Sequence, residues 1–155
     1  MAGAHPEERL AELGLKLPDV PKPAGAYVPA LRNGSLVYTS GQLPFVDGTL
    51  PATGKVGAAV SAEQAKDLAR RCALNALAAV KSEIGDLAKV KRVVKVLAFV
   101  ASDPSSTAQP GVANGASELL AEVFGEAGVH ARSAVGVAVL PLDSPVEVEI
   151  VVEVE

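Results

Sequence analysis

Residues 146–155 alternate between apolar and charged side chains, and this pattern constrains the fold more than any other stretch. Every even-numbered position from Val146 to Val154 holds Val or Ile, and every odd-numbered position except Val151 holds Glu. Successive side chains of a β-strand point to opposite faces of a sheet, so a period of two is typical of a strand with one buried face. We therefore predict a strand here, buried on its Val and Ile side.

The run before it, Ser133–Leu140, is almost entirely apolar or small. A strand covered on both faces has this composition, so we predict a central strand that forms a pair with the C-terminal one. Pro141 and Pro145 lie between the two runs, where a missing N–H group costs least. Arg132 opens this pair of strands and is the first candidate for a functional side chain.

A β-hairpin is predicted around Asn33-Gly34. The strand-like runs 26–31 and 36–40 flank this dipeptide, and both of its residues tolerate the positive φ of a tight turn. Ahead of the hairpin, residues 7–14 have the composition of a short helix that ends at a glycine. The proline-rich residues 18–25 are expected to form an extended connector.

Two long helices alternate with strands in the rest of the chain. Ser61–Gln64 has the form of a capping box, and apolar residues follow it at helical spacing. Residues 90–100 are another strong strand candidate, and a second helix is expected from about Asn114 to Glu126. This order favours one α+β domain over residues 1–155, a sandwich with both helices packed on one face of a mixed sheet.

Composition and charge disfavour several classes of protein. The net charge of −4 argues against a nucleic-acid binder, since phosphate contacts need clustered Lys and Arg. The single cysteine, Cys72, cannot form an intramolecular disulfide, and its place on an apolar helix stripe is typical of a core residue. His5 and His130 are too far apart in sequence to suggest a metal site. With no leader peptide and no apolar run of about 20 residues, we expect a cytoplasmic protein that contacts no membrane.

Three motifs together resemble one known family. They are Tyr38–Pro44, Ala131–Val135, and Leu140-Pro141 followed by Val146–Glu149. In this order and spacing they are similar to the Rid, or YjgF-like, family of reactive intermediate deaminases. The resemblance covers about residues 24–154, and residues 1–23 form an extension beyond the family's usual short N-terminus.

The resemblance implies a chorismate-mutase-like fold and a homotrimer with three clefts between subunits. It also implies hydrolysis of reactive 2-imino acids, such as 2-iminobutanoate and 2-iminopropanoate, to 2-oxo acids and ammonia, with no metal or cofactor. Arg132 matches the arginine that binds the substrate carboxylate, and Glu149 matches the glutamate that holds the attacking water. The positions that match the pocket lining are Tyr27, Ser40, Gly41, Asn114 and Ala134, the last standing where many members carry a cysteine.

Other interpretations stay open. The same trimer could bind a 2-oxo acid-like metabolite without turnover, which Ala134 favours, because a fold does not fix a function. Ribonuclease or translation-inhibitor activity, a label that some relatives carry, is disfavoured by the acidic balance. At the residue level, Arg132 has a plainer interpretation as an exposed arginine. The plainer interpretation of Glu149 is that it belongs to a solvated strand face, where Glu147 and Glu153 are also expected.

Overall fold

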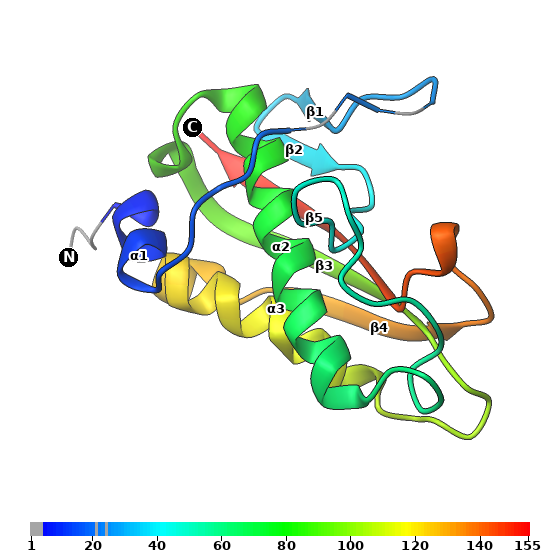
Figure 1. Ribbon diagram of the computed structural model, residues 1–155. Helices are drawn as coiled ribbons and strands as arrows, with labels where there is room; N and C mark the ends of the chain where they lie inside the picture. Colours follow the sequence, from blue (N-terminus) through cyan, green and yellow to red (C-terminus); the bar gives the residue numbers. More distant parts are fainter. Residues whose placement is uncertain (1–4, 21, 24) are drawn as a thin grey trace.

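A mixed five-stranded sheet forms the centre of the molecule. The computed structural model describes residues 5–20, 22, 23 and 25–155, so residues 1–4 and 21 of the predicted extension lie outside it. The strands are arranged in the order β1-β2-β5-β3-β4 (Figure 1). β3 runs parallel to β4, and the other neighbouring strands are antiparallel. The bounds are β1 Ala30–Asn33, β2 Leu36–Thr39, β3 Val90–Ala101, β4 Ala131–Val137 and β5 Val146–Val154.

β5 has the one-sided burial that its alternating sequence predicts. Its even-numbered residues are buried, and its odd-numbered residues are partly exposed. Ile150 lies opposite Val96 of β3, and Val148 lies opposite Ala98, so the apolar faces of the two strands are continuous. The predicted strand and its buried face are confirmed.

The prediction that the run after Arg132 forms a central strand is wrong. Among the strands that the structure describes, β4 is an edge strand that pairs only with β3, while β5 occupies the inner position between β2 and β3. The two C-terminal strands therefore flank β3 rather than pairing with each other. Burial inside the sheet does not explain the apolar composition of β4, since Val135 on this strand is 43% exposed.

The hairpin is present, one residue further along than predicted. β1 extends to Asn33, which pairs with Leu36, so Gly34 and Ser35 form the two-residue turn. Gly34 has a φ of 64°, the left-handed conformation that such a turn requires. Residues 26–29 lie outside the strand, in an irregular segment that precedes β1.

Two long helices cover one face of the sheet, as predicted (Figure 1). α2 (Ala62–Ile84) begins with the predicted cap, in which Ser61 Oγ accepts a hydrogen bond from the Gln64 N–H group, and ends at Gly85. α3 (Gln109–Phe124) begins earlier than the expected Asn114, because Pro110 fits the first turn of a helix. The shorter helices are α1 (Pro6–Glu12), η1 (Leu87–Lys89), η2 (Gly125–Gly128) and η3 (Pro141–Asp143).

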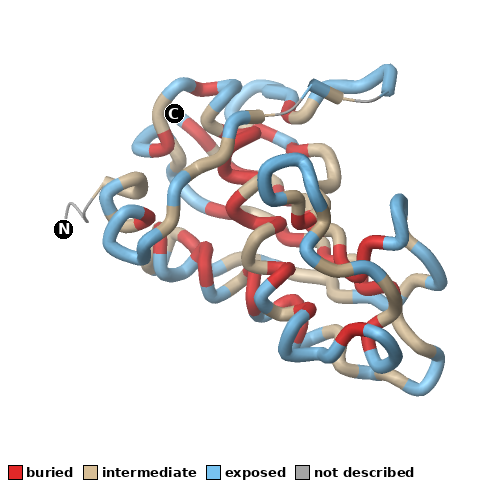
Figure 2. Tube along the Cα trace, viewed as in Figure 1, coloured by how far each residue is buried: buried red, intermediate tan, exposed pale blue. Residues whose placement is uncertain are grey.

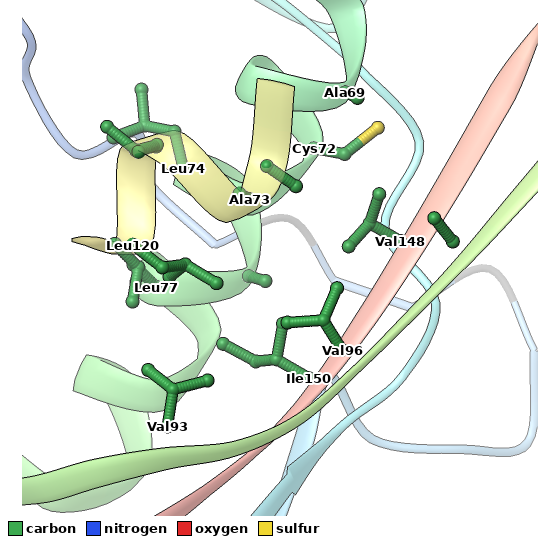
Figure 3. Packing of buried hydrophobic residues seen from close by; sticks show 14 of the residues in the cluster. Ala69, Cys72, Ala73, Leu74, Leu77, Val93, Val96, Leu120, Val148 and Ile150 are labelled. Atoms are coloured by element: carbon green, nitrogen blue, oxygen red, sulfur yellow. The ribbon is translucent and has the colours of Figure 1, made fainter. Parts of the chain in front are cut away.

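The core lies between the helices and the sheet. Figure 2 shows buried residues where α2, α3 and the strands face one another, and exposed residues on the outer turns of the helices. Leu77 of α2 and Leu120 of α3 are buried in the same cluster as Val96 and Ile150 of the sheet (Figure 3). Cys72 is fully buried there, which confirms its interpretation as a core residue. Within the described ranges, no helix is both long and apolar enough to cross a bilayer.

The opposite face of the sheet carries large apolar side chains that stay partly exposed. Tyr38 of β2 is 42% exposed and Leu31 of β1 is 53% exposed. The odd-numbered residues of β5, among them Glu147 and Glu149, point to this same face, because their even-numbered neighbours point to the helices. We call this surface the open face.

Candidate functional site

Arg132 lies on the helix side of the sheet edge, at the start of β4. It pairs with the buried Val96 in the parallel ladder, and its guanidinium reaches α3. Arg132 Nη1 donates hydrogen bonds to Asn114 Oδ1 at 2.7 Å and to Ser117 Oγ at 3.1 Å, and Nη2 lies 3.5 Å from the Pro110 carbonyl oxygen. All of these partners are uncharged. None of them neutralises the positive charge of the guanidinium, which can therefore still bind an anion.

The predicted residue Asn114 is thus brought to Arg132, and Ser117 joins it from the next turn of α3. Residues three apart on a helix lie on the same side, which explains why both reach one guanidinium. Ala134, also predicted, lies two residues along β4 and shares the helix face with Arg132, where it packs on the core. These residues form the arginine group of the site: Asn114, Ser117, Arg132 and Ala134.

A cavity of about 240 Å³ opens beside Arg132. His130 lies on its wall, where its Nε2 atom is 2.9 Å from Ser117 Oγ and its Nδ1 atom is 2.6 Å from the Gly128 carbonyl oxygen. Burial lowers the pKa of His130, and the nearby charge of Arg132 lowers it further, against the hydrogen bond to Gly128. His130 is therefore a neutral imidazole around pH 7. The lining residues are Ser117, Ala121, Gly128, Val129, His130 and Arg132.

Ser40 and Gly41 follow β2 and lie beside a glutamate that the sequence did not single out. Ser40 Oγ donates to the Val28 carbonyl oxygen at 2.5 Å, which ties it to the irregular segment before β1. Gly41 lies directly under the side chain of Glu147, and a Cβ atom at position 41 would overlap Glu147 Oε1. Glycine at position 41 lets the carboxylate end of Glu147 lie close to the backbone. We call Ser40, Gly41 and Glu147 the glutamate group.

Glu147 is half-buried, contrary to its expected place on a solvated strand face. Burial raises the pKa of its carboxyl group, and the negative charge of Glu149 raises it further. A carboxylate with a raised pKa is a stronger base, and perturbed carboxyl groups of this kind are frequent at functional sites. Among the acidic side chains of β5, Glu147 therefore has the environment best suited to proton transfer.

Glu149 and Tyr27, both predicted site residues, lie on the side of the glutamate group. Glu149 points to the open face from the position opposite Leu97. Tyr27 is 57% exposed in the irregular segment before β1. The backbone around this group is fixed by hydrogen bonds between Gln42 and Val148, with the Gln42 N–H group 2.8 Å from the Val148 carbonyl oxygen.

The two groups lie on opposite faces of the same sheet. Arg132 shares its face with α3, whereas Glu147 and Glu149 point to the open face. One chain therefore does not bring the arginine and the glutamates together. A site that used both would need an arginine group from one copy and a glutamate group from another.

Another polar cluster, His5, Glu7 and Asp86, has ligand atoms within 4.8 Å of one another. Internal contacts already use these atoms. His5 Nε2 is 2.8 Å from Asp86 Oδ1, Glu7 forms an ion pair with Lys81, and Asp86 Oδ1 accepts from the Ala88 N–H group at 2.9 Å. The cluster fastens α1 to the end of α2 and to η1.

The fold and these contacts define a class of protein, a small α+β domain whose sheet edge presents a charged arginine beside a cavity. Comparison with known proteins gives the family. Residues 7–154 match the family described as "YjgF/chorismate mutase-like, putative endoribonuclease". The chain belongs to this family.

The chain is also similar to individual proteins over most of its length. Protein TCP17 of Trypanosoma cruzi is 46% identical over 99% of this chain and 96% of its own length. The crystal structure of Atu1372 from Agrobacterium tumefaciens, a protein of unknown function, superposes with a TM-score of 0.91 at 47% identity over 97% of this chain and 93% of that one. E. coli TdcF, crystallised with bound serine, superposes with a TM-score of 0.63 at 26% identity over 88% and 94% of the two chains.

Sequence reasoning missed Ser117, His130 and Glu147. The spacing from Asn114 to Ser117 was a usable signal, since helix neighbours three apart meet the same partner. Strand alternation offered no means to choose between Glu147 and Glu149, because residues two apart share a face. His130 comes near Ser117 only through the packing of α3 against the start of β4, which no local pattern encodes.

Proposed function

We propose that this protein hydrolyses 2-imino acids to 2-oxo acids and ammonia. The observation that carries the proposal is the guanidinium of Arg132, which is held by uncharged partners beside a cavity. A planar guanidinium binds a carboxylate through two parallel charge-assisted hydrogen bonds. Bound serine in the related TdcF supports a small substrate that carries a carboxylate.

The chemical step needs a base and an oriented water. A protonated imine carbon is already electrophilic, so water adds to it once positioned, and the water proton passes to a carboxylate. We assign this role to Glu147, whose pKa is raised, with Glu149 acting through its charge. The carboxyl group then protonates the amine, the hydroxyl gives its proton back to the carboxylate, and the C–N bond breaks, so that ammonia leaves and the 2-oxo group forms.

The proposed site requires a partner copy. The two groups lie on opposite faces of the sheet within one chain, so they can meet only between chains. A closed homotrimer would place the arginine group of one subunit beside the glutamate group of the next. The partly exposed apolar side chains of the open face are the surface that such an assembly would cover.

A coupled assay tests this function. An amino acid oxidase generates the imine, and semicarbazide traps whatever is not hydrolysed. The protein should lower the trapped imine, and Arg132→Ala should reduce the rate at least about thirtyfold, the loss expected when a buried charge pair loses one partner. Arg132→Lys should recover only part of it, because an ammonium lacks the planar fork. Arg92→Ala, an exposed arginine on β3, is the matched control.

The same assay distinguishes the roles of Glu147 and Glu149. Glu147→Gln should abolish hydrolysis while leaving 2-oxo acid binding in place, and Glu149→Gln should have the smaller effect. The opposite ranking would move the base to Glu149. An unchanged rate in Arg132→Ala would defeat the whole assignment.

A second candidate is a metabolite-binding protein without turnover. Ala134 favours it, because the position that holds a thiol in many relatives has no reactive group here. Binding of a 2-oxo acid, lost in Arg132→Ala, together with no imine hydrolysis would establish this function instead.

A further inference from the structure

Ser117, His130 and Gly128 form a hydrogen-bonded chain on the wall of the cavity. Ser117 comes from the middle of α3, and His130 comes from the residue before β4. His130 Nε2 lies 2.9 Å from Ser117 Oγ, and His130 Nδ1 lies 2.6 Å from the Gly128 carbonyl oxygen. In the proposed imine hydrolysis the Ser117 hydroxyl only helps to hold Arg132, and the imidazole has no role.

The direction of these hydrogen bonds follows from donor and acceptor chemistry. A carbonyl oxygen only accepts, so His130 Nδ1 must carry the proton. In the neutral imidazole Nε2 then holds a lone pair, and the Ser117 hydroxyl donates to it. Burial and the charge of Arg132 lower the pKa of His130, which keeps the ring neutral around pH 7. Ser117 is thus hydrogen-bonded to a base that is itself oriented by a third group.

Arg132 adds a cation to the pair. Its Nη1 atom donates to Ser117 Oγ at 3.1 Å, so negative charge that develops on or near this oxygen is stabilised. The cavity beside these atoms measures about 240 Å³, below the roughly 300 Å³ lower bound for drug-sized ligands. Ala121 and Val129 give it an apolar side. It suits a short acyl group.

From this arrangement we infer a second activity, the hydrolysis of small carboxylic esters through an acyl group on Ser117. Ser117 Oγ bonds to the ester carbonyl carbon while its proton passes to His130 Nε2, and Arg132 faces the resulting oxyanion. The bond to the alcohol oxygen then breaks, and the alcohol leaves with the proton from Nε2. Water next attacks the acyl carbon and gives a proton to Nε2, and Ser117 leaves as a hydroxyl with that proton, releasing the acid.

The experiment uses the full chain and two probes. p-Nitrophenyl acetate reports turnover, and diethyl p-nitrophenyl phosphate forms a stable phosphoryl adduct that peptide mass mapping locates. We expect the adduct on Ser117 and ester hydrolysis that falls about a hundredfold or more in Ser117→Ala and in His130→Gln. Glutamine keeps a hydrogen-bonding side chain but no base, so a purely structural histidine would tolerate this change better than a catalytic one.

Ser82→Ala is the matched control, because this part-buried helix serine donates only to the Ala79 carbonyl oxygen of its own helix. Mapping of the adduct is done on the unaltered protein, so the test holds even where a variant fails to fold. An adduct on another residue, no adduct, or hydrolysis that survives Ser117→Ala would overturn the inference. Hydrolysis that depends on His130 but not on Ser117 would also overturn it, since the imidazole would then be the nucleophile.

Discussion

Glu147 makes the stability of this protein sensitive to pH through a single side chain. Its carboxyl group ionises near 4.5 in an unconstrained chain, and in the folded protein burial and the charge of Glu149 raise this pKa. The folded state therefore binds the proton more tightly than the unfolded state. The resulting stabilisation is full below pH 4.5 and is lost as the pH rises through the folded-state pKa.

Glu147→Gln should accordingly be more stable than the parent protein at pH 7, because the amide removes a half-buried charge that lies near a like charge. The difference in melting temperature should shrink towards zero as the pH falls below about 4.5. Thermal unfolding across this pH range checks it. Glu153→Gln on the same strand face is the control, since that carboxylate lies 3.5 Å from Lys91 Nζ and its loss should bring no gain. A parent protein more stable than Glu147→Gln at pH 7 would contradict the prediction.

At the scale of elements, the packing of α2 on α3 is set by one glycine. A Cβ atom at position 115 would overlap the backbone carbonyl oxygen of Lys66 and lie 2.8 Å from its carbon, so the helices meet where α3 has no side chain. Backbone atoms cannot move aside as the end of a flexible side chain can. This contact sets how closely α3 packs on α2.

Gly115→Ala should therefore destabilise the protein by about 1–3 kcal/mol or more, through forced separation of the two helices. Gly111→Ala in the first turn of the same helix meets no atom within 4 Å and should be neutral or stabilise by up to about 1 kcal/mol. Urea unfolding of the two variants measures both free energies. Equal effects would show that helix propensity, and not the close approach, decides the outcome at position 115.

The elements also show what the sequence can predict. Periodicity found β5, α2 and the burial of Cys72, because each depends on spacing along one segment. It misjudged β4, because an apolar edge strand and a central strand have the same composition, and only the pairing of other strands tells them apart. The predicted start of α3 was Asn114 and the observed start is Gln109, because a proline in a sequence indicates a helix break even where it lies in the first turn of a helix. For the site, motif positions brought Arg132 and Asn114 together, while Ser117, His130 and Glu147 depend on contacts between segments distant in sequence.

At the scale of the whole molecule, the imine-hydrolysing site that we propose would be divided between copies. Co-expression of Arg132→Ala with Glu147→Gln under two different affinity tags tests this division, since each variant alone should be inactive. In mixed trimers purified through both tags, some interfaces combine an intact arginine group with an intact glutamate group. A closed ring of three that contains both variants has one such interface among its three, so about a third of the parental rate should return. Failure of the mixture to exceed the separate variants would show that no such division exists.

The inner position of β5 has a consequence for how this chain is made. During synthesis, the β1–β2 hairpin and the unit of β3, α3 and β4 emerge from the ribosome first, yet the sheet has a gap between them until β5 arrives. Until β5 is made, the apolar surfaces of both pieces stay exposed to solvent. The edges of β2 and β3 also stay unpaired and can bind a neighbouring strand. The strand that joins the molecule into a single sheet is thus translated after the other four, and synthesis that stops before Val146 would leave two half-sheets with no strand between them.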